Sequence, residues 1–228
     1  MLRKIIITAI AAATLAATPA KPTRSALGGA GTNRSAEQTL PYDAEVEYLQ
    51  STGTQYIIFD EIINGFEGVL LPENNNAYGA VGNWNGGSQA NAIKWAYVQN
   101  RGWIVTSQAS GSYVYSGNLN RDMLLVTVRG TAVTIGGSSY TLREGWSSQP
   151  KFMLFGCVSW GSSVSQANTP SPQASTIGAC KLYFNNTLLR DLQPVRKDGV
   201  GYMYDRVSGQ LFGNSGTGAF VMGPDKIR

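Results

Sequence analysis

The sequence predicts an all-β protein, an antiparallel β-sandwich, and three observations support this prediction. Short runs in which apolar and polar residues alternate recur from residue 45 to residue 222, which is typical of half-buried strands. Glycine occurs 27 times and separates these runs, as tight turns require. Finally, no stretch keeps the apolar period of a helix for more than a turn or two.

Residues 1–20 are predicted to be a secretory signal peptide. Arg3 and Lys4 form a basic start, residues 5–17 are apolar and uncharged, and Ala20 is a small residue suited to cleavage. The apolar stretch is short for a bilayer, so an uncleaved N-terminal anchor is the less favoured alternative. We therefore expect a secreted, periplasmic or cell-surface protein, with no membrane insertion after the signal is removed.

Residues 21–42 are predicted to be a flexible linker, and residues 43–228 a single β domain. The linker has too few large apolar residues to offset the entropy lost on ordering. Cleavage after Ala20 would leave 208 of the 228 residues, which suits one sandwich with a tail. Of the 18 basic residues 16 would remain against 14 acidic ones, a net charge of +2 without a basic aromatic cluster. We therefore expect no nucleic-acid partner.

The first half of the domain is predicted to consist of strands joined by polar turns. The expected strands are residues 45–58 (one strand or a pair), 66–71, 78–84, 93–99, 103–107 and 112–115. In the first of them Val46, Tyr48, Tyr56 and Ile58 are expected to face inward. A hairpin is expected across Gly102, because glycine accepts the positive φ of a short turn.

The second half continues the same pattern. The expected strands are residues 123–128, 132–135, 140–142, 151–160, 179–184 and 188–192, then short pieces at 202–204, 210–212 and 219–222. Residues 129–131 and the pair Asn185-Asn186 are expected to form hairpin turns. Residues 161–177 read as a long polar loop, and Pro194 as the end of a strand, because proline has no N–H to donate.

Two cysteines, Cys157 and Cys180, lie in strand-like runs 23 positions apart. Export would permit a disulfide between them, worth roughly 3 kcal/mol for a loop of this size. We predict this disulfide; the alternative is two buried free thiols in neighbouring strands.

Two segments of the domain resemble a known family. Residues 47–57 read EYLQSTGTQYI, and residues 189–220 read LRDLQPVRKDGVGYMYDRVSGQLFGNSGTGAF. They are similar to the opening and closing segments of concanavalin A-like (laminin-G-like) jelly-roll domains of bacterial surface proteins and phage tail proteins. The resemblance covers about residues 43–225 and implies a jelly-roll fold more firmly than an activity, because lectins, glycosidases and structural modules share this fold.

The residue types present argue against an enzyme. The chain has no histidine, which removes Ser-His-Asp and Cys-His catalysis and histidine metal sites, and no glycine pattern for a nucleotide. A glycoside hydrolase needs two carboxylates across a cleft. Glu45 and Glu47 lack the third acid of the glucanases with this fold, and the adjacent Asp60 and Glu61 would face opposite ways in a strand. A glycoside hydrolase is therefore the least favoured function.

No cofactor or metal is predicted. Calcium is common in proteins of this fold, but the candidate ligands Asp60, Asp122 and Asp205 do not cluster in the sequence. Asp205, which precedes Arg-Val-Ser-Gly, is expected to cap a turn instead.

Carbohydrate binding without chemistry fits the composition better. Sugar rings stack on aromatic side chains, and amide side chains bind their hydroxyl groups. The candidate ligand-binding residues lie near polar loops or among serines and glycines: Trp84, Trp160, Trp103, Tyr113, Tyr115, Asn83 and Asn85. Trp95 and Trp146 are expected to be structural, and a core position is the alternative for every tryptophan.

Two functions remain. The first is a secreted, lectin-like module that binds a glycan or a cell-surface polysaccharide and serves in adhesion. The second is a structural or assembly subunit of a surface appendage or a phage-like particle, with a protein partner or self-association. The predicted signal peptide favours the first function.

Overall fold

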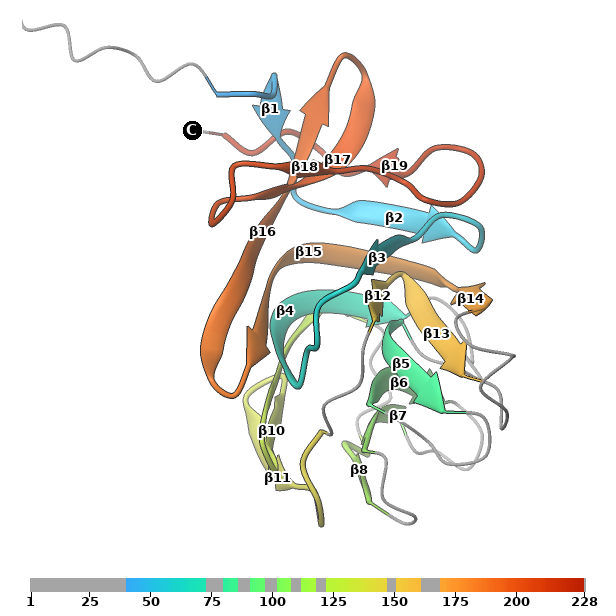
Figure 1. The fold of residues 1–228 in the computed structure, drawn as a ribbon, viewed down its shortest axis with the longest axis vertical. Coiled ribbons are helices and arrows are strands. Elements are labelled where there is room, and N and C mark those ends of the chain that lie inside the picture. The colour runs from blue at the N-terminus through green and yellow to red at the C-terminus, as the bar shows by residue number, and fades with distance from the viewer. Residues whose placement is uncertain are drawn as a thin grey trace, which may run out of the picture. The chain divides into compact units, whose positions relative to one another are not determined.

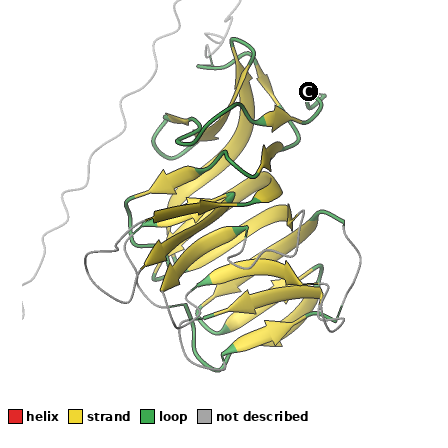
Figure 2. Ribbon diagram, turned by 90° about the vertical axis from the view of Figure 1, so that its right-hand side faces the viewer, coloured by secondary structure: helices red, strands yellow, loops and turns green. Residues whose placement is uncertain are grey.

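Two β-sheets pack face to face in the computed structural model of the chain (Figure 1). The structure describes residues 40–72, 80–85, 91–96, 102–107, 112–117, 122–146, 151–160 and 169–227. Every regular element in these ranges is a strand, and every strand pair is antiparallel except β5 with β13 (Figure 2). The predicted all-β antiparallel sandwich is therefore confirmed, whereas its jelly-roll topology stays a prediction.

The strands divide unequally between the sheets. The large sheet contains β1 (Ala44–Glu45), β2 (Leu49–Thr52), β4 (Gly65–Pro72), β9 (Leu124–Arg129), β10 (Ala132–Ile135), β11 (Ser138–Thr141), β15 (Ala174–Phe184), β16 (Thr187–Lys197), β17 (Val200–Asp205), β18 (Leu211–Phe212) and β19 (Val221–Met222). The small sheet contains β3 (Ile57–Phe59), β5 (Val81–Asn85), β6 (Ala92–Ala96), β7 (Gly102–Thr106), β8 (Tyr113–Tyr115), β12 (Phe152–Leu154), β13 (Gly156–Trp160) and β14 (Thr169–Pro172).

The large sheet is built around its two longest strands, β15 and β16, of 11 residues each. They are joined by the turn Asn185-Asn186, whose φ angles of 47° and 64° are left-handed, as asparagine tolerates. The turn of the β9–β10 hairpin likewise contains Gly130, with a φ of 55°. These two predicted hairpin turns are confirmed, whereas the hairpin predicted across Gly102 includes residues outside the described ranges.

The core between the sheets is apolar. Large side chains from both sheets, such as Phe66 and Leu182 on one side and Trp103 and Phe152 on the other, are fully buried. Burial of this kind is the main source of stability in a two-layer sandwich. Of the residues expected to face inward, Val46 is buried, but Tyr48, Tyr56 and Ile58 are only half-buried. In β3 it is Ile57 and Phe59 that face the core.

Pro194 does not end a strand, contrary to the prediction. It lies inside β16, opposite Met203 of β17. Its carbonyl accepts a hydrogen bond of 3.0 Å from the backbone N–H of Val46. Since N–H and C=O of one residue point to the same side of an antiparallel strand, the missing N–H faces the short strand β1, and the ladder to β17 stays intact.

The long loop predicted at residues 161–177 was wrong in its second half. Residues 169–172 form β14 and residues 174–177 begin β15, where Ser175 and Thr176 are buried against β2 and β4. Both prolines of this stretch lie in β14, the last strand on its side of the small sheet, which is where a sheet accepts proline. The predicted strand at 151–160 is also interrupted, because Phe155 has a φ of 63° and separates β12 from β13.

The predicted disulfide is absent: neither cysteine forms a disulfide, and both are buried. Cys157 lies in β13 of the small sheet, with its Sγ 3.5 Å from the carbonyl oxygen of Val81. Cys180 lies in β15 of the large sheet and packs in the core. The two thiols therefore belong to different sheets. Burial, with a smaller contribution from the charge of Asp191, raises the pKa of the Cys180 thiol, which keeps it protonated and unreactive.

Candidate functional site

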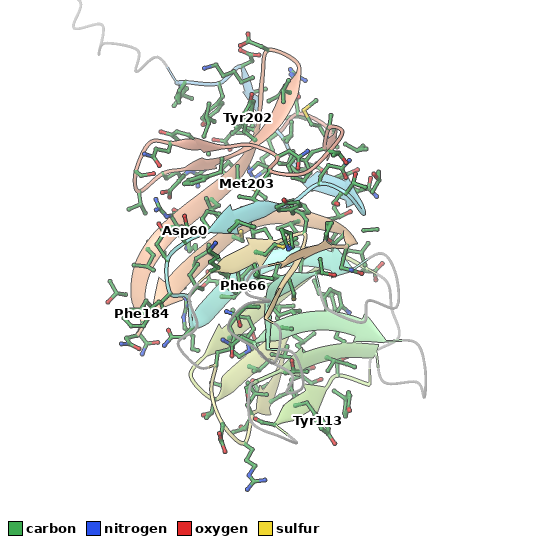
Figure 3. All side chains as sticks on the ribbon, turned by 45° about the vertical axis from the view of Figure 1, so that its right-hand side comes forward. Asp60, Phe66, Tyr113, Phe184, Tyr202 and Met203 are labelled. Carbon is green, nitrogen blue, oxygen red and sulfur yellow. The ribbon has the colours of Figure 1, made fainter. Side chains whose placement is uncertain are left out.

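Two of the predicted ligand-binding residues form a pair of rings on the surface, which we call the tyrosine pair. Tyr113 and Tyr115 lie on one face of β8, the last strand on its side of the small sheet. Their ring centroids are 4.8 Å apart, with the planes tilted by 52°. Tyr113 is 46% exposed, and Figure 3 shows it at the opposite end of the sandwich from Tyr202.

The tyrosine pair owes its orientation to the residue between its members. Val114 is buried in the core, and because alternate residues of a strand face opposite ways, both neighbours must face outward. The pairing of β7 with β8 places Thr106 opposite Tyr113 and Ile104 opposite Tyr115. An apolar residue and a threonine therefore lie beside the two rings.

Trp103 is not a surface residue, so its prediction as a ligand platform was wrong. Its side chain is fully buried in the core, and its indole Nε1 has no hydrogen-bond partner among the described residues. Asn83 is also fully buried, and its side-chain amide donates to the carbonyl oxygen of Lys151 at 3.3 Å. Neither side chain is accessible to a glycan, because the strands that contain them pack both groups inside the sandwich.

The remaining candidates are described only by their backbone. Trp84 and Asn85 end β5, and Trp160 ends β13, where it is paired with Asn85. Their side chains, like that of Trp95, lie outside the described part of the structure. The expectation that Trp146 is structural is confirmed, since it is buried and its indole N–H donates to the carbonyl oxygen of Thr106 at 2.8 Å.

Asp205 caps a turn, as predicted, and it is the most completely hydrogen-bonded side chain of the closing segment. Its carboxylate accepts the backbone N–H groups of Asp191, Val207 and Ser208, and the Ser208 hydroxyl at 2.6 Å. Arg190 adds an ion pair at 2.9 Å and also contacts Glu61. Burial alone would raise the pKa of Asp205, but these hydrogen bonds outweigh it and lower the pKa below its ordinary value.

The candidate calcium ligands do not meet. Asp205 is occupied by its own hydrogen bonds, Asp60 lies 3.9 Å from the Nζ of Lys151, and Asp122 is exposed. Within the described ranges no three acidic, cysteine or histidine side chains gather as metal ligands.

The outer face of the large sheet carries a polar row that the sequence did not reveal. Strand register aligns seven polar residues across neighbouring strands: Ser139, Thr134, Thr127, Glu67, Lys181, Asp191 and Arg206. Paired residues of adjacent strands share a face of the sheet, so these side chains all point to the outside. The next row along the strands, which includes Val126, Cys180 and Leu192, is buried in the core.

A depression of about 300 Å³ lies over the charged part of this row, and we call it the outer-face depression. It is lined by residues of β4, β9, β15 and β16 and of the turn after β17: Glu67, Gly68, Leu125, Ala179, Cys180, Lys181, Asp191 and Arg206. Glu67 is held by two cations, Arg129 at 3.0 Å and Lys181 at 3.6 Å. The guanidinium of Arg129 also lies over the face of the Tyr183 ring.

No local signal could have identified these residues. Glu67, Leu125, Lys181 and Asp191 come from four strands that are far apart in the sequence, and each looks like an ordinary outward position. Only the strand order β9-β4-β15-β16 brings them together.

Comparison with known proteins adds no relative. No family model, no curated protein and no solved structure matches the chain. The resemblance to concanavalin A-like domains therefore depends on residues 47–57 and 189–220 alone and stays a prediction. Across the part of the chain that the structure describes, no helix has the length and hydropathy needed to cross a bilayer.

Proposed function

We propose that this chain is a secreted, non-catalytic module that binds a glycan through the tyrosine pair, on a domain of the concanavalin A-like class. The observation that supports the proposal is the exposure of Tyr113 beside Tyr115 on the outer face of β8. Aromatic rings on a surface offer an apolar face for the C–H groups of a sugar and phenolic hydroxyls for its polar groups.

The tilt between the rings limits how a glycan can lie on them. Two rings inclined by 52° cannot both lie flat against one extended chain. One ring would stack on a sugar, and the other would contact the neighbouring residue from the side with its edge or its hydroxyl. This arrangement favours a bent or branched glycan over a flat crystalline polysaccharide surface.

A glycan array tests this proposal. The full chain is screened together with Tyr113→Ala, Tyr113→Phe and Tyr115→Ala, and with Tyr202→Ala as a distant control. We expect binding that falls roughly tenfold in Tyr113→Ala, since an aromatic contact contributes about 1 kcal/mol or more. Binding should be retained in Tyr113→Phe, which keeps the stacking face, and in Tyr202→Ala.

The same material tests the alternative of a structural or assembly subunit. If no glycan binds at high protein concentration, the binding proposal is wrong. Light scattering that shows concentration-dependent assembly would then support the structural function. Binding that survives both alanine substitutions would keep a glycan-binding function but exclude the tyrosine pair as its site.

A further inference from the structure

We propose that the outer-face depression is a second, independent binding site, for one uncharged pyranose residue with neighbouring hydroxyl groups. The tyrosine pair lies on the small sheet, whereas the depression lies on the large sheet, so neither site requires the other. Three properties of the depression support the proposal: its charge balance, its hydrogen-bonding groups and its size.

The charges that line the depression cancel. Glu67 and Asp191 contribute two negative charges, and Lys181 and Arg206 two positive ones. Arg129 adds a further positive charge nearby, but this charge is used by Glu67 and by the ring of Tyr183. A phosphate would meet two carboxylates and a polyamine would meet the cations, so a neutral polar ligand suits the site best.

Asp191 is the acceptor of the site. Within the described residues its carboxylate has no ion pair and no side-chain hydrogen bond, although Glu67 on the same row has two cationic partners. An ionised carboxylate has two oxygens that only accept hydrogen bonds. Two neighbouring hydroxyl groups of a sugar ring can donate one hydrogen bond to each oxygen, which makes the contact bidentate and charge-assisted.

Donors flank this acceptor on both sides. Register pairs Lys181 with Asp191, and the backbone N–H of Arg206 donates to the carbonyl oxygen of Asp191. The ammonium group of Lys181 has three donors, and its ion pair with Glu67, at 3.6 Å, is too long to be a hydrogen bond. Among the described residues, the guanidinium of Arg206 has only long contacts of 3.4 Å, to Glu45 and to Gln193, so it can turn toward a ligand.

The apolar wall and the volume set the size of the ligand. Leu125, which is 50% exposed, and Ala179 line the depression with apolar side chains. Such a wall matches the C–H face of a sugar ring. A volume of about 300 Å³ is at the lower limit for small-molecule sites, which suits one ring and not an extended chain.

The experiment titrates the full chain with methyl glucoside, methyl galactoside and methyl mannoside, followed by saturation-transfer NMR and calorimetry. Inorganic phosphate and ethylammonium serve as the charged probes. Asp191→Asn removes one of the two acceptor oxygens, and Lys181→Met removes a donor but keeps the aliphatic stem. Asp198→Asn is the matched control, because Asp198 lies in the exposed turn between β16 and β17.

We expect at least one glycoside to bind, with affinity at least about tenfold lower in Asp191→Asn, as for loss of a charge-assisted hydrogen bond. Lys181→Met should also weaken binding, whereas Asp198→Asn should not change it. The inference is wrong if no glycoside binds, if Asp191→Asn leaves the affinity unchanged, or if phosphate or ethylammonium displaces the glycoside. Loss of glycoside binding in Tyr113→Ala alone would also overturn it, but would support the tyrosine pair as the glycan site.

Discussion

The β17–β18 hairpin of the large sheet and the centre of the small sheet differ in how their buried polar groups are hydrogen-bonded. In the hairpin, the buried carboxylate of Asp205 accepts hydrogen bonds from three backbone N–H groups, one hydroxyl and Arg190. In β5, in β7 and directly after β7, three fully buried polar atoms have no partner among the described residues: Asn83 Oδ1, Trp103 Nε1 and Ser107 Oγ.

This difference indicates where buried polar groups contribute to the stability of the sandwich. A buried polar group stabilises a fold when all its hydrogen bonds are made, and costs free energy when they are not. The hydrogen bonds of Asp205 therefore stabilise the hairpin, although Nε of its partner Arg190 is itself buried without a partner among the described residues. All seven predicted ligand-binding residues belong to the small sheet, where the unpartnered atoms of Asn83 and Trp103 also lie.

The largest effect is expected where the hairpin network is broken. Asp205→Ala leaves the guanidinium of Arg190 without its buried partner and three backbone N–H groups without an acceptor. We expect the free energy of unfolding, measured by urea titration, to fall by about 3–5 kcal/mol. The control Asp198→Asn, at an exposed turn whose left-handed φ of 50° asparagine accepts, should change it by less than about 0.5 kcal/mol. A loss below about 1 kcal/mol for Asp205→Ala would show that the hydrogen bonds of Asp205 are not a major source of stability.

An intermediate effect is expected from pH. The pKa of Asp205 is lowered in the folded protein, whereas in the unfolded chain the group binds its proton near pH 4. The stabilisation it provides is therefore complete above about pH 5 and is lost as the pH falls through the lowered, folded-state pKa.

Urea unfolding of the wild type and of Asp205→Asn between pH 7 and pH 2 measures this contribution. The wild type should lose more stability than Asp205→Asn across the acid range. Equal slopes for the two proteins would mean that another carboxylate controls the acid response.

The smallest effects come from one substitution made in both regions. Ser208→Ala removes the hydroxyl that donates to Asp205 and should cost about 1 kcal/mol. Ser107→Ala removes a buried hydroxyl that has no partner among the described residues, so it should leave stability unchanged or raise it by up to about 1 kcal/mol. Thermal unfolding of the two variants provides the comparison. Effects of the same sign would show that the two regions do not differ in the hydrogen bonding of their serine hydroxyls.

The most accurate predictions from the sequence concern features that depend only on residues close together in the chain. The turns at Gly130 and Asn185-Asn186 and the cap at Asp205 are short-range features, and all three are confirmed. Each depends on a residue type with its own backbone preference or its own local hydrogen bond, so no knowledge of distant strands was needed.

Features that depend on strand register could not be predicted from the sequence. A shift of one residue exchanges the two faces of a strand, which is why Ile57 and Phe59, and not Tyr56 and Ile58, face the core. In β7 all five residues are buried, so alternation could not show that Trp103 points inward. The outer-face depression needs four strands in register, and no single stretch of sequence contains that information.

The C-terminal end of the chain lies beside β1 (Figure 1), and this has a mechanical consequence. Val46 bridges to Asp225, the backbone N–H of Lys226 donates to the carbonyl oxygen of Glu45, and Arg196 contacts Asp225 through two hydrogen bonds of 2.8 and 2.9 Å. A force that pulls residues 44 and 226 apart would act first on these few contacts. It would break their hydrogen bonds one after another from the end of the sandwich, instead of breaking all the hydrogen bonds between β15 and β16 at once.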